Sequence, residues 1–523
     1  MFARQQGMAH PDQPAVIMGS SGETVTFGEY EARSNRVAHL LRDAGLRHGD
    51  HIAVLIENSL RLLEIEGGAE RTGLYYSLIN TYLGAEEVAY IVANSQARVL
   101  FSSTARRVVA EAAAAKCPGL DRMLMTGPGP VPAGWEQYDT VVAGYPAAPV
   151  PGESRGAAML YSSGTTGQPK GIQRELPAAS PGEILPVQEF VRSMFGFREG
   201  MTYLNPAPLY HSAPHASVSA ALRMGCTVIV MDHFDPEQWL VLVERYRVTH
   251  CQMVPTMFSR LLRLPGTVRA RYDTSSLECI VHAAAPCPVP VKRAMIDWLG
   301  PIIAEYYGAT EANGFTFCTT AQWLAHPGTV GRPILGELLI LDGTGKECRT
   351  GEDGTIWFRG ATAFEYFQDP VETAQSRSAD GAASTVGDIG HVDADGYLYL
   401  TDRKSYMIIS GGVNIYPQEA ENVLSAHPAV QDVAVIGVPN ADLGEEVKAV
   451  VQLVDPDAAG PGLAEDLIAY CRDRLAHFKC PRTVDFVPEL PRSETGKLYK
   501  RLLRDAYWAG RRSPIGGEGT RRP

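Results

Sequence analysis

The sequence lacks the paired cysteines that build a disulfide framework or a zinc site. Its nine cysteines are scattered between Cys117 and Cys480, and no two of them have the C-x-x-C spacing. An odd and unclustered set of cysteines is typical of reduced thiols in a cytoplasmic protein. We therefore expect a cytoplasmic protein without disulfides or structural zinc.

Long apolar runs and an excess of positive charge are also missing. No apolar run approaches the roughly 20 residues that span a bilayer, and the first seven residues lack the apolar stretch of a signal peptide. The 59 acidic and 47 basic residues give a formal net charge of −12. This balance argues against nucleic acid or an anionic membrane as the main partner. A local basic patch for a phosphorylated cofactor stays compatible with it.

At 523 residues the chain exceeds the size of one hydrophobic core, so we expect two or more domains. In the first half, strand-like runs such as residues 51–56 alternate with helical patterns, one of which Asn58 is expected to cap. This alternation predicts a layered α/β domain with a largely parallel sheet. The Pro, Gly and Ala-rich stretch 118–151 is expected to be connecting structure, and residues 177–186 a loop insertion.

The second half has a different pattern. Residues 328–360 combine short strand-like runs with turns such as Asp342-Gly343, which predicts a β-rich segment. After Thr401 a smaller and more charged stretch of mixed helix and strand follows. We therefore predict an N-terminal domain over 1–402 and a C-terminal domain over 403–509. The Gly, Arg and Pro-rich tail, 510–523, is expected to be disordered.

The strongest local signal is the stretch Tyr-Ser-Ser-Gly-Thr-Thr-Gly-Gln-Pro-Lys-Gly, residues 161–171. Glycines let a backbone approach a ligand closely, successive N–H groups and hydroxyls bind anions, and a lysine adds charge suited to phosphate. Pro169 and the apolar run before the stretch argue against a flexible linker. The stretch is therefore predicted to hold a polyphosphate through Ser162, Ser163, Gly164, Thr165, Thr166, Gly167 and Lys170. It is not a Walker P-loop, which needs Gly before the lysine and Ser or Thr after it.

This stretch closely resembles the phosphate-binding loop of the adenylate-forming superfamily, which includes acyl-CoA synthetases, adenylation domains of peptide synthetases and luciferases. The resemblance implies an α/β protein. Its large N-terminal domain would hold layered α/β subdomains and a β-rich subdomain, and its small α+β C-terminal domain would be mobile. It also implies that the chain binds ATP.

A second stretch, Tyr307-Gly308-Ala309-Thr310-Glu311, resembles the Tyr-Gly-x-Thr-Glu motif of the same family. The resemblance implies that Tyr307 and Gly308 lie near adenine, that Thr310 contacts the α-phosphate and that Glu311 binds magnesium, for which a carboxylate is a suitable hard ligand. Upstream, Ala284, Ala285 and Pro286 stand where the family carries a Gly-Gly-Ala-Pro type of loop against adenine. Here alanines replace the glycines.

Three further motifs follow in the order of the family. Asp388 resembles its Gly-Asp motif, whose carboxylate can accept both hydroxyls of a ribose. Arg403, in Asp402-Arg403-Lys404, resembles the nucleotide-contacting arginine of its hinge, although Ser405 stands where Asp or Lys is usual. Gly411 and Gly412 resemble a loop that lines a pantetheine tunnel.

The last two resemblances concern the reacting groups. Lys497, in Thr495-Gly496-Lys497, resembles the C-terminal lysine that bridges a carboxylate oxygen and the α-phosphate as negative charge develops. His211 matches a motif whose histidine or aromatic residue gates the acyl site. We therefore assign Lys497, Thr310, Glu311 and His211 as candidate catalytic residues.

Together the motifs imply an ATP-dependent, AMP-forming acyl-CoA synthetase with ATP, magnesium and coenzyme A. In such an enzyme the acid first reacts with ATP to give an acyl-adenylate, and the thiol of coenzyme A then attacks it. Rotation about residues 402–405 would withdraw Lys497 after the first step and present the Gly412 loop for the second. Three alternatives stay open: an adenylation enzyme that loads an acyl carrier-protein thiol, a luciferase-type monooxygenase and a non-catalytic nucleotide-binding relative.

The substrate is less well defined by the sequence. No Asp stands out as an anchor for an α-amino group, so a fatty, aromatic or bulky polycyclic (terpenoid or steroid-like) acid is favoured over an amino acid. The sequence resembles actinobacterial synthetases for bulky lipid or terpenoid acids. It leaves a homodimer open.

Overall fold

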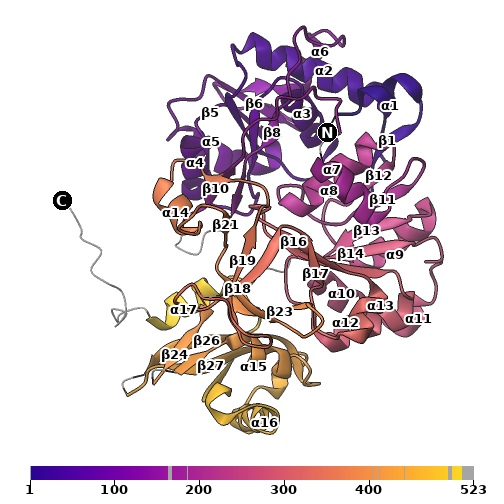
Figure 1. Ribbon diagram of the computed structural model, residues 1–523. Coiled ribbons are helices and arrows are strands. Elements are labelled where there is room, and N and C mark those ends of the chain that lie inside the picture. The colour runs from indigo at the N-terminus through magenta and orange to yellow at the C-terminus, as the bar shows by residue number, and fades with distance from the viewer. Residues whose placement is uncertain are drawn as a thin grey trace.

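The computed structural model describes residues 2–162, 168–184, 186–403, 406–411, 413–440, 442–492 and 498–508. A large N-terminal part contains several sheets, and a small part from residue 406 onward forms a sheet of its own (Figure 1). This arrangement confirms the expected α/β fold with a large and a small domain. The exact boundary at 402/403 stays a prediction, since residues 404 and 405 lie outside the described ranges.

The first sheet of the large part is parallel, as the alternation of strands and helices predicts. Its strand order is β7-β6-β5-β3-β4-β8, and every pair in it is parallel. The strands are β3 (His51–Leu55), β4 (Tyr75–Leu78), β5 (Ala97–Ser103), β6 (Arg122–Thr126), β7 (Glu136–Gln137) and β8 (Ala157–Ala158). The accompanying helices are α2 (Phe27–Asp43), α3 (Leu60–Glu70), α4 (Ala85–Asn94), α5 (Arg107–Ala114) and α6 (Tyr138–Ala143).

Two sequence predictions about this sheet are wrong. The stretch 118–151 is not merely connecting structure, because it supplies β6, β7 and α6. Asn58 does not cap α3; the Ser59 side chain does, accepting from the N–H of Leu62. The Asn58 amide instead donates to the carbonyls of Ala207 and Met231, which belong to the second sheet's connections. A long-range pairing therefore replaces the expected local cap.

The second sheet has nine strands in the order β17-β16-β15-β14-β13-β11-β12-β1-β2, with parallel pairs from β15 to β1 and antiparallel pairs at both edges. Its strands are β1 (Pro14–Met18), β2 (Thr24–Thr26), β11 (Thr202–Asn205), β12 (Thr227–Val230), β13 (His250–Met253), β14 (Cys279–His282), β15 (Ile303–Gly308), β16 (Phe315–Cys318) and β17 (Arg332–Leu335). Its helices are α1 (Arg4–Ala9), α7 (Pro186–Phe195), α8 (Ser212–Arg223), α9 (Pro236–Tyr246), α10 (Pro255–Arg263), α11 (Gly266–Arg269), α12 (Val289–Leu299) and α13 (Thr320–Ala325).

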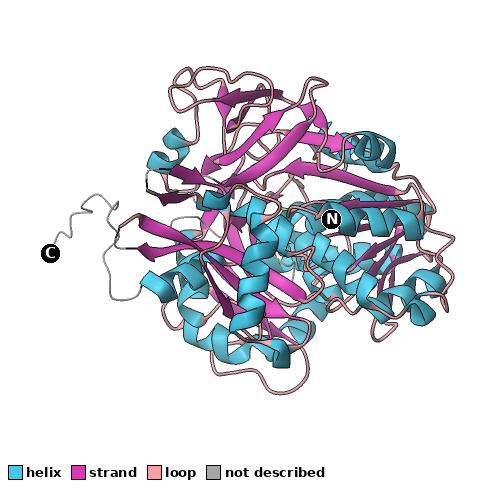
Figure 2. Ribbon diagram, turned by 90° about the horizontal axis from the view of Figure 1, so that it is seen from below, coloured by secondary structure: helices cyan, strands magenta, loops and turns pink. Residues whose placement is uncertain are grey.

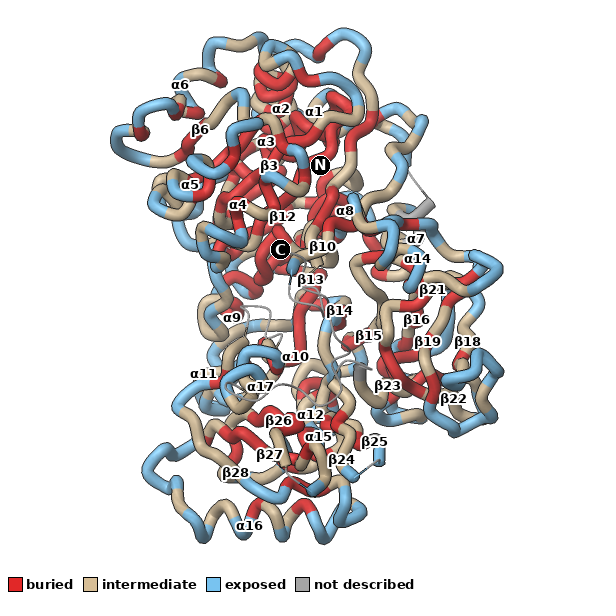
Figure 3. Tube along the Cα trace, turned by 90° about the vertical axis from the view of Figure 1, so that its left-hand side faces the viewer, coloured by how far each residue is buried: buried red, intermediate tan, exposed pale blue. Residues whose placement is uncertain are grey.

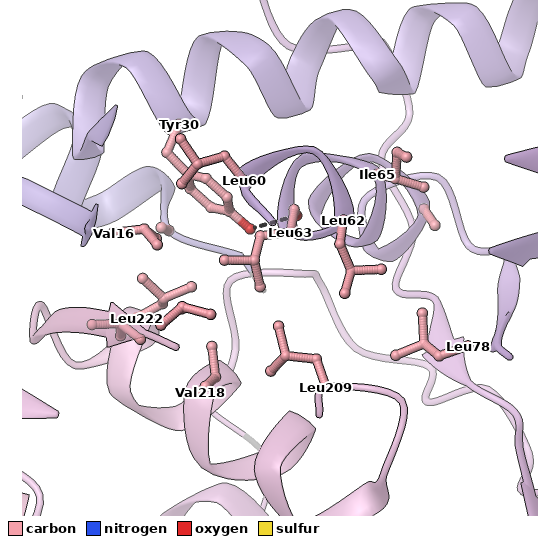
Figure 4. Packing of buried hydrophobic residues seen from close by; sticks show 14 of the residues in the cluster. Val16, Tyr30, Leu60, Leu62, Leu63, Ile65, Leu78, Leu209, Val218 and Leu222 are labelled. Atoms are coloured by element: carbon pink, nitrogen blue, oxygen red, sulfur yellow. Dashed lines mark hydrogen bonds between the residues drawn. The ribbon is translucent and has the colours of Figure 1, made fainter. Parts of the chain in front are cut away.

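The core of the large part lies where helices of the two sheets meet. Leu62 and Leu63 of α3 face Val218 and Leu222 of α8, and the Tyr30 hydroxyl donates to the Leu63 carbonyl at 3.0 Å (Figure 4). Buried residues concentrate in the inner helices and central strands (Figure 3). This apolar contact fixes α8, and α8 carries residues of the candidate site.

The remaining elements confirm the β-rich second half and complete the small domain, with helices lying against the strands throughout (Figure 2). A three-stranded sheet joins β9 (Leu160–Ser162), β10 (Lys170–Gln173) and β20 (Glu365–Tyr366). The β-rich segment holds β18 (Glu337–Leu341), β19 (Gly354–Arg359), β21 (Ala383–Ser384), β22 (Asp388–Val392) and β23 (Leu398–Arg403), with α14 (Pro370–Gln375) nearby. The small domain holds β24 (Ile408–Ser410), β25 (Val413–Ile415), α15 (Pro417–Leu424), β26 (Val430–Asn440), β27 (Gly444–Leu453), α16 (Pro461–Arg472), β28 (Thr483–Phe486) and α17 (Lys500–Trp508). Within the described ranges, no helix is both long and apolar enough to cross a membrane.

A buried ion pair joins helix α12 to strand β15 of the second sheet. The Lys292 ammonium of α12 contacts the Glu305 carboxylate of β15 at 2.5 Å, and the His282 ring lies 3.4 Å from the same oxygen. Burial alone would raise the pKa of Glu305, but His282 and Lys292 hold it below its ordinary value. The Glu305 carboxylate therefore stays ionised inside the protein, beside the Lys292 ammonium.

Glu305→Gln is expected to lower the free energy of unfolding by about 3–5 kcal/mol, because the Lys292 charge is then buried without its partner. Urea unfolding followed by tryptophan fluorescence measures the loss, since Trp323 lies 4.8 Å from the Lys292 ammonium. The double variant Lys292→Met/Glu305→Leu is the matched control and should recover most of the stability. A Glu305→Gln protein as stable as the parent would refute this account of the pair.

Candidate nucleotide and acid site

Three of the predicted motifs meet at one edge of the nine-stranded sheet. His211 follows β11, Ala284 to Pro286 follow β14, and Thr310 and Glu311 follow β15. These strands are parallel, so their carboxyl ends lie at the same edge, where open α/β sheets bind their ligands. The fold thus gathers motifs that lie up to about 100 residues apart in the sequence.

The predicted phosphate loop is held by a hairpin. Ser162 at the end of β9 is the register partner of Lys170 at the start of β10, so both ends of the intervening loop lie side by side. The predicted residues Ser163, Gly164, Thr165, Thr166 and Gly167 lie outside the described residues. The Lys170 ammonium forms an ion pair with Glu372 of α14 and lies 5.3 Å from the centre of the Tyr366 ring.

Tyr366 joins the phosphate loop to the second motif. It lies in β20, which pairs with β10, and its hydroxyl donates to Glu311 Oε1 at 2.9 Å. Both side chains are buried. The same tyrosine therefore holds the candidate metal ligand Glu311 through its hydroxyl and faces the Lys170 cation with its ring.

The sequence reasoning missed Tyr366 and Glu372. They lie about 200 residues after the loop, and only the pairing of β20 with β10 brings them to Lys170. A local signal for α14 was present, since Asp369 caps this helix and Pro370 begins it. That signal locates the helix but not its partner.

Thr310 is fixed from two sides. Its hydroxyl lies 3.3 Å from that of Ser212, the first residue of α8, and its carbonyl accepts a hydrogen bond from Arg174, which follows β10. His211 directly precedes Ser212, and its ring centre lies 4.6 Å from that of Tyr210. The candidate α-phosphate residue and the candidate gate of the acyl site are therefore neighbours at the start of α8.

Tyr307 and Asp388, both assigned to the nucleoside, contact each other directly. The Tyr307 hydroxyl donates to Asp388 Oδ2 at 2.7 Å, and the Tyr307 ring stacks on Phe358 with centres 6.4 Å apart. Asp388 begins β22, and its register partner on β23 is Arg403, whose side chain is not described. The β-rich segment thus brings two predicted nucleotide residues beside the carboxyl edge of the large sheet.

Two positions in this region have backbone surroundings that suit glycine. Gly308 has no space for a side chain, since an added Cβ would lie 2.4 Å from the Phe315 ring. Ala284 has a φ of 75°, in the left-handed region that favours glycine and costs other residues about 1–2 kcal/mol. The backbone at Ala284 therefore keeps a glycine conformation although the residue is alanine.

Tyr307→Phe is expected to raise the KM for ATP about fivefold, because a hydrogen bond worth about 1 kcal/mol no longer orients the Asp388 carboxylate. The kcat should stay close to that of the parent. Steady-state kinetics with ATP as the varied substrate measure the change. Tyr399→Phe removes a similar Tyr–Asp hydrogen bond, to Asp393 at 3.2 Å, in the same β-rich segment and is the matched control. Equal KM changes in both variants would contradict the assignment.

The small-domain residues are only partly described. Gly411 is exposed with a φ of 58°, and its N–H donates to the Leu443 carbonyl at 2.9 Å. Gly412, Ser405 and Lys497 lie outside the described residues. Arg492 and Leu498, which flank the Lys497 segment, form a bridge, so the base of that segment is closed. The predicted hinge is tied to α15, since Asp402 accepts from the N–H of Gln418 at 3.0 Å.

The residues around Glu311 suit a magnesium ion that is held by one carboxylate together with substrate phosphates. Among the described residues, no group of three or more His, Cys, Asp or Glu side chains is arranged to bind a metal. Glu311 is a single buried carboxylate beside the candidate phosphate loop. Such a ligand suits Mg²⁺, which commonly binds through one or two carboxylates together with substrate phosphates and water.

The motifs, the sheet edge and the two-part fold agree with the comparison to known families. The chain belongs to the AMP-binding enzyme family, whose model matches residues 3–367, while residues 419–497 match the model of the AMP-binding enzyme C-terminal domain. The predicted membership of the adenylate-forming superfamily is therefore confirmed. The chain is an adenylate-forming ligase that uses ATP to activate an acid for transfer to CoA or to a carrier protein.

Characterised relatives cover almost the whole chain. The chain is 31% identical to fatty acid–[acyl-carrier-protein] ligase ScoC of Streptomyces coeruleorubidus, over 95% of this chain and 94% of that protein. It is 34% identical to a feruloyl-CoA synthase of an Amycolatopsis species, over 94% and 96% of the two chains. Its fold is similar to that of the anthranilate CoA ligase AuaEII in complex with anthranoyl-AMP, with a TM-score of 0.85, 27% identity and coverage of 97% and 96%.

Proposed function

We propose that the protein is an acyl-CoA synthetase: it forms an acyl-adenylate from a carboxylic acid and ATP and transfers the acyl group to coenzyme A. The contact network of Lys170, Tyr366, Glu311, Thr310 and Ser212 supports this proposal. It places a cation, a buried carboxylate and two hydroxyls together at the ligand-binding edge of the sheet. These are the groups that a magnesium-bound triphosphate and an attacking carboxylate require.

In the first half-reaction, an oxygen of the acid attacks the α-phosphorus of ATP. The bond from the α-phosphorus to pyrophosphate breaks, and pyrophosphate leaves with the electron pair. Lys170, released from Glu372, binds the outer phosphates, and Thr310 donates to the α-phosphate. Magnesium held by Glu311 would neutralise phosphate charge. Lys497 bridges the acid and the α-phosphate as negative charge develops between them.

In the second half-reaction, the CoA thiolate attacks the acyl carbon and AMP leaves. The small domain turns about residues 402–405, so that Lys497 withdraws and the Gly411-Gly412 turn faces the adenylate. The hydrogen bond from the Gln418 N–H to Asp402 joins the end of the large domain to the first helix of the small one. Asp388 and Arg403 hold the ribose and phosphate of the adenylate throughout.

One alternative stays open. A carrier-protein thiol is the second candidate acceptor, because the relative ScoC is named for that acceptor. A non-catalytic nucleotide-binding role is disfavoured by the presence of both Glu311 and Lys497. The acid is proposed to be fatty, aromatic or bulky polycyclic.

Pyrophosphate release from ATP across a panel of carboxylic acids tests the proposal. The assay is run with no acceptor, with free CoA and with a holo-carrier protein, and AMP is measured in parallel. We expect acid-dependent pyrophosphate and one acyl-CoA per AMP. Thioester formed only on the carrier protein would assign the alternative acceptor, and no cleavage of ATP with any acid would refute the ligase.

A further inference from the structure

The small domain contacts the large domain at a point outside the hinge segment. Arg263, the last residue of α10, donates from Nη2 to the Gln431 carbonyl of β26 at 2.6 Å, and α10 lies at the boundary between the two domains (Figure 3). The hydrogen bond of Asp402 with Gln418, in contrast, lies beside the hinge. A rotation about residues 402–405 carries β26 away from α10, so the Arg263 contact belongs to one orientation of the small domain.

The residue after Gln431 is Asp432, whose carboxylate holds Arg492. Arg492 donates to Asp432 from Nε at 2.5 Å and from Nη2 at 2.7 Å, the two-bond geometry in which arginine binds a carboxylate most strongly. Asp432 also acts on Arg263: partial burial lowers the pKa of the Arg263 guanidinium, and the Asp432 charge opposes that shift. One carboxylate of the small domain therefore attracts an arginine of each domain.

Arg492 is the last described residue before the segment that carries Lys497. It forms a bridge with Leu498, the first described residue after that segment. Leu498 in turn packs against the buried apolar cluster of β26 and β27. Both ends of the segment are therefore fixed to the small domain, and Asp432 links them to Arg263 on the large domain.

The turn proposed to receive coenzyme A faces solvent in the same orientation. Gly411 and Val413, on either side of Gly412, are exposed, and Val413 keeps 45% of its surface accessible. In the second half-reaction this turn would face the adenylate, where an apolar side chain is covered. With the base of the Lys497 segment tied to α10 and this turn in solvent, the orientation suits acyl-adenylate formation.

We propose that, given the ligase function above, Arg263 is a positioning residue for acyl-adenylate formation. Its guanidinium holds the small domain in the orientation that presents Lys497, by binding the Gln431 carbonyl beside Asp432. Arg263 is an exposed side chain, so water competes for this contact and its stabilising effect is modest. A contact of this strength favours the first half-reaction and still breaks when the small domain turns for the second.

The test measures the two half-reactions separately in full-length Arg263 variants. Pyrophosphate release with ATP and the best acid of the panel gives the first rate, and thioester formation from the synthetic adenylate of that acid with CoA gives the second. Each rate is proportional to the share of molecules in its orientation, so the ratio of the first rate to the second reports the orientation. Arg263→Ala is expected to lower this ratio about 5- to 10-fold, the effect of one exposed hydrogen bond with a charged donor.

Two further variants frame that result. Arg263→Glu should lower the ratio more than Arg263→Ala does, because the new carboxylate is repelled by Asp432. Arg260→Ala removes another exposed arginine from the last turn of α10 and is the matched control, which should keep the parent ratio. All three variants should unfold thermally near the parent temperature, because both arginines lie on the surface.

Asp432→Asn tests the link between Arg263 and the Lys497 segment. It weakens the carboxylate that attracts both arginines, so it should also lower the ratio. The double variant Arg263→Ala/Asp432→Asn should lower the ratio by less than the product of the two single effects, because both changes act on one contact. A full product would show that Arg263 acts independently of Asp432 and would contradict this link.

An unchanged ratio in both Arg263→Ala and Arg263→Glu would overturn this inference while leaving the ligase function intact. Equal losses in both half-reactions would overturn it too, because they would show a role other than the choice of orientation. Failure of the parent protein to release pyrophosphate with any acid would instead refute the proposed function, and this inference with it.

Discussion

Replacing Lys497 by alanine is expected to lower acyl-adenylate formation by about 100- to 1,000-fold, the usual cost of removing one donor that stabilises developing charge. The same variant should convert supplied acyl-adenylate and CoA to the thioester at the parent rate. The reason is that Lys497 is assigned only to the step in which the acid oxygen attacks the α-phosphorus. Pyrophosphate release measures the first step, and thioester formation from synthetic acyl-adenylate measures the second.

Lys346→Ala is the matched control for this experiment, because Lys346 is an exposed lysine in a turn of the β-rich segment. It should affect neither step. Equal loss of both half-reactions in Lys497→Ala would contradict the division of labour between the two orientations of the small domain.

Glu311→Gln is expected to lower acyl-adenylate formation by about 100-fold or more, because an amide is a much weaker ligand for magnesium than a carboxylate. Thioester formation from supplied acyl-adenylate should be unaffected, since no triphosphate takes part in that step. Raising the magnesium concentration should restore only part of the loss. Glu347→Gln, an exposed carboxylate in the β-rich segment, is the matched control and should behave as the parent.

Tyr366→Phe gives a graded version of the same test. It removes only the hydroxyl that holds Glu311 and keeps the ring beside Lys170. A hydrogen bond of about 1 kcal/mol corresponds to about a fivefold higher magnesium concentration at half-maximal rate. An unchanged magnesium dependence in both Glu311→Gln and Tyr366→Phe would show that Glu311 does not bind the metal.

The sequence was informative where function depends on consecutive residues. The phosphate loop and the Tyr307–Glu311 motif are short, so their chemistry can be read locally, and the structure places Lys170 and Glu311 on either side of Tyr366. The parallel order of β3, β4 and β5 was also predictable, because strands separated by helices favour parallel pairing.

The rest depended on contacts between distant segments. Strand pairing or a single long-range contact brings three residues to the site: Tyr366, Glu372 and Arg174. No local sequence pattern indicates their partners. Asn58 shows the same limit, since its amide prefers distant carbonyls to the adjacent helix start. The strands within 118–151 escaped detection because Pro and Gly surround them and they depend on strand pairing, β6 with β5 and β7 with β6.

An isotope experiment tests the central claim most directly. An acid labelled with ¹⁸O in both carboxyl oxygens is converted to its CoA thioester, and AMP, pyrophosphate and any ADP are examined by mass spectrometry. If the acid oxygen attacks the α-phosphorus, each AMP carries one ¹⁸O and the pyrophosphate carries none. Label in phosphate with formation of ADP, or AMP without label, would contradict an acyl-adenylate and with it the roles given to Lys170, Thr310 and Glu311.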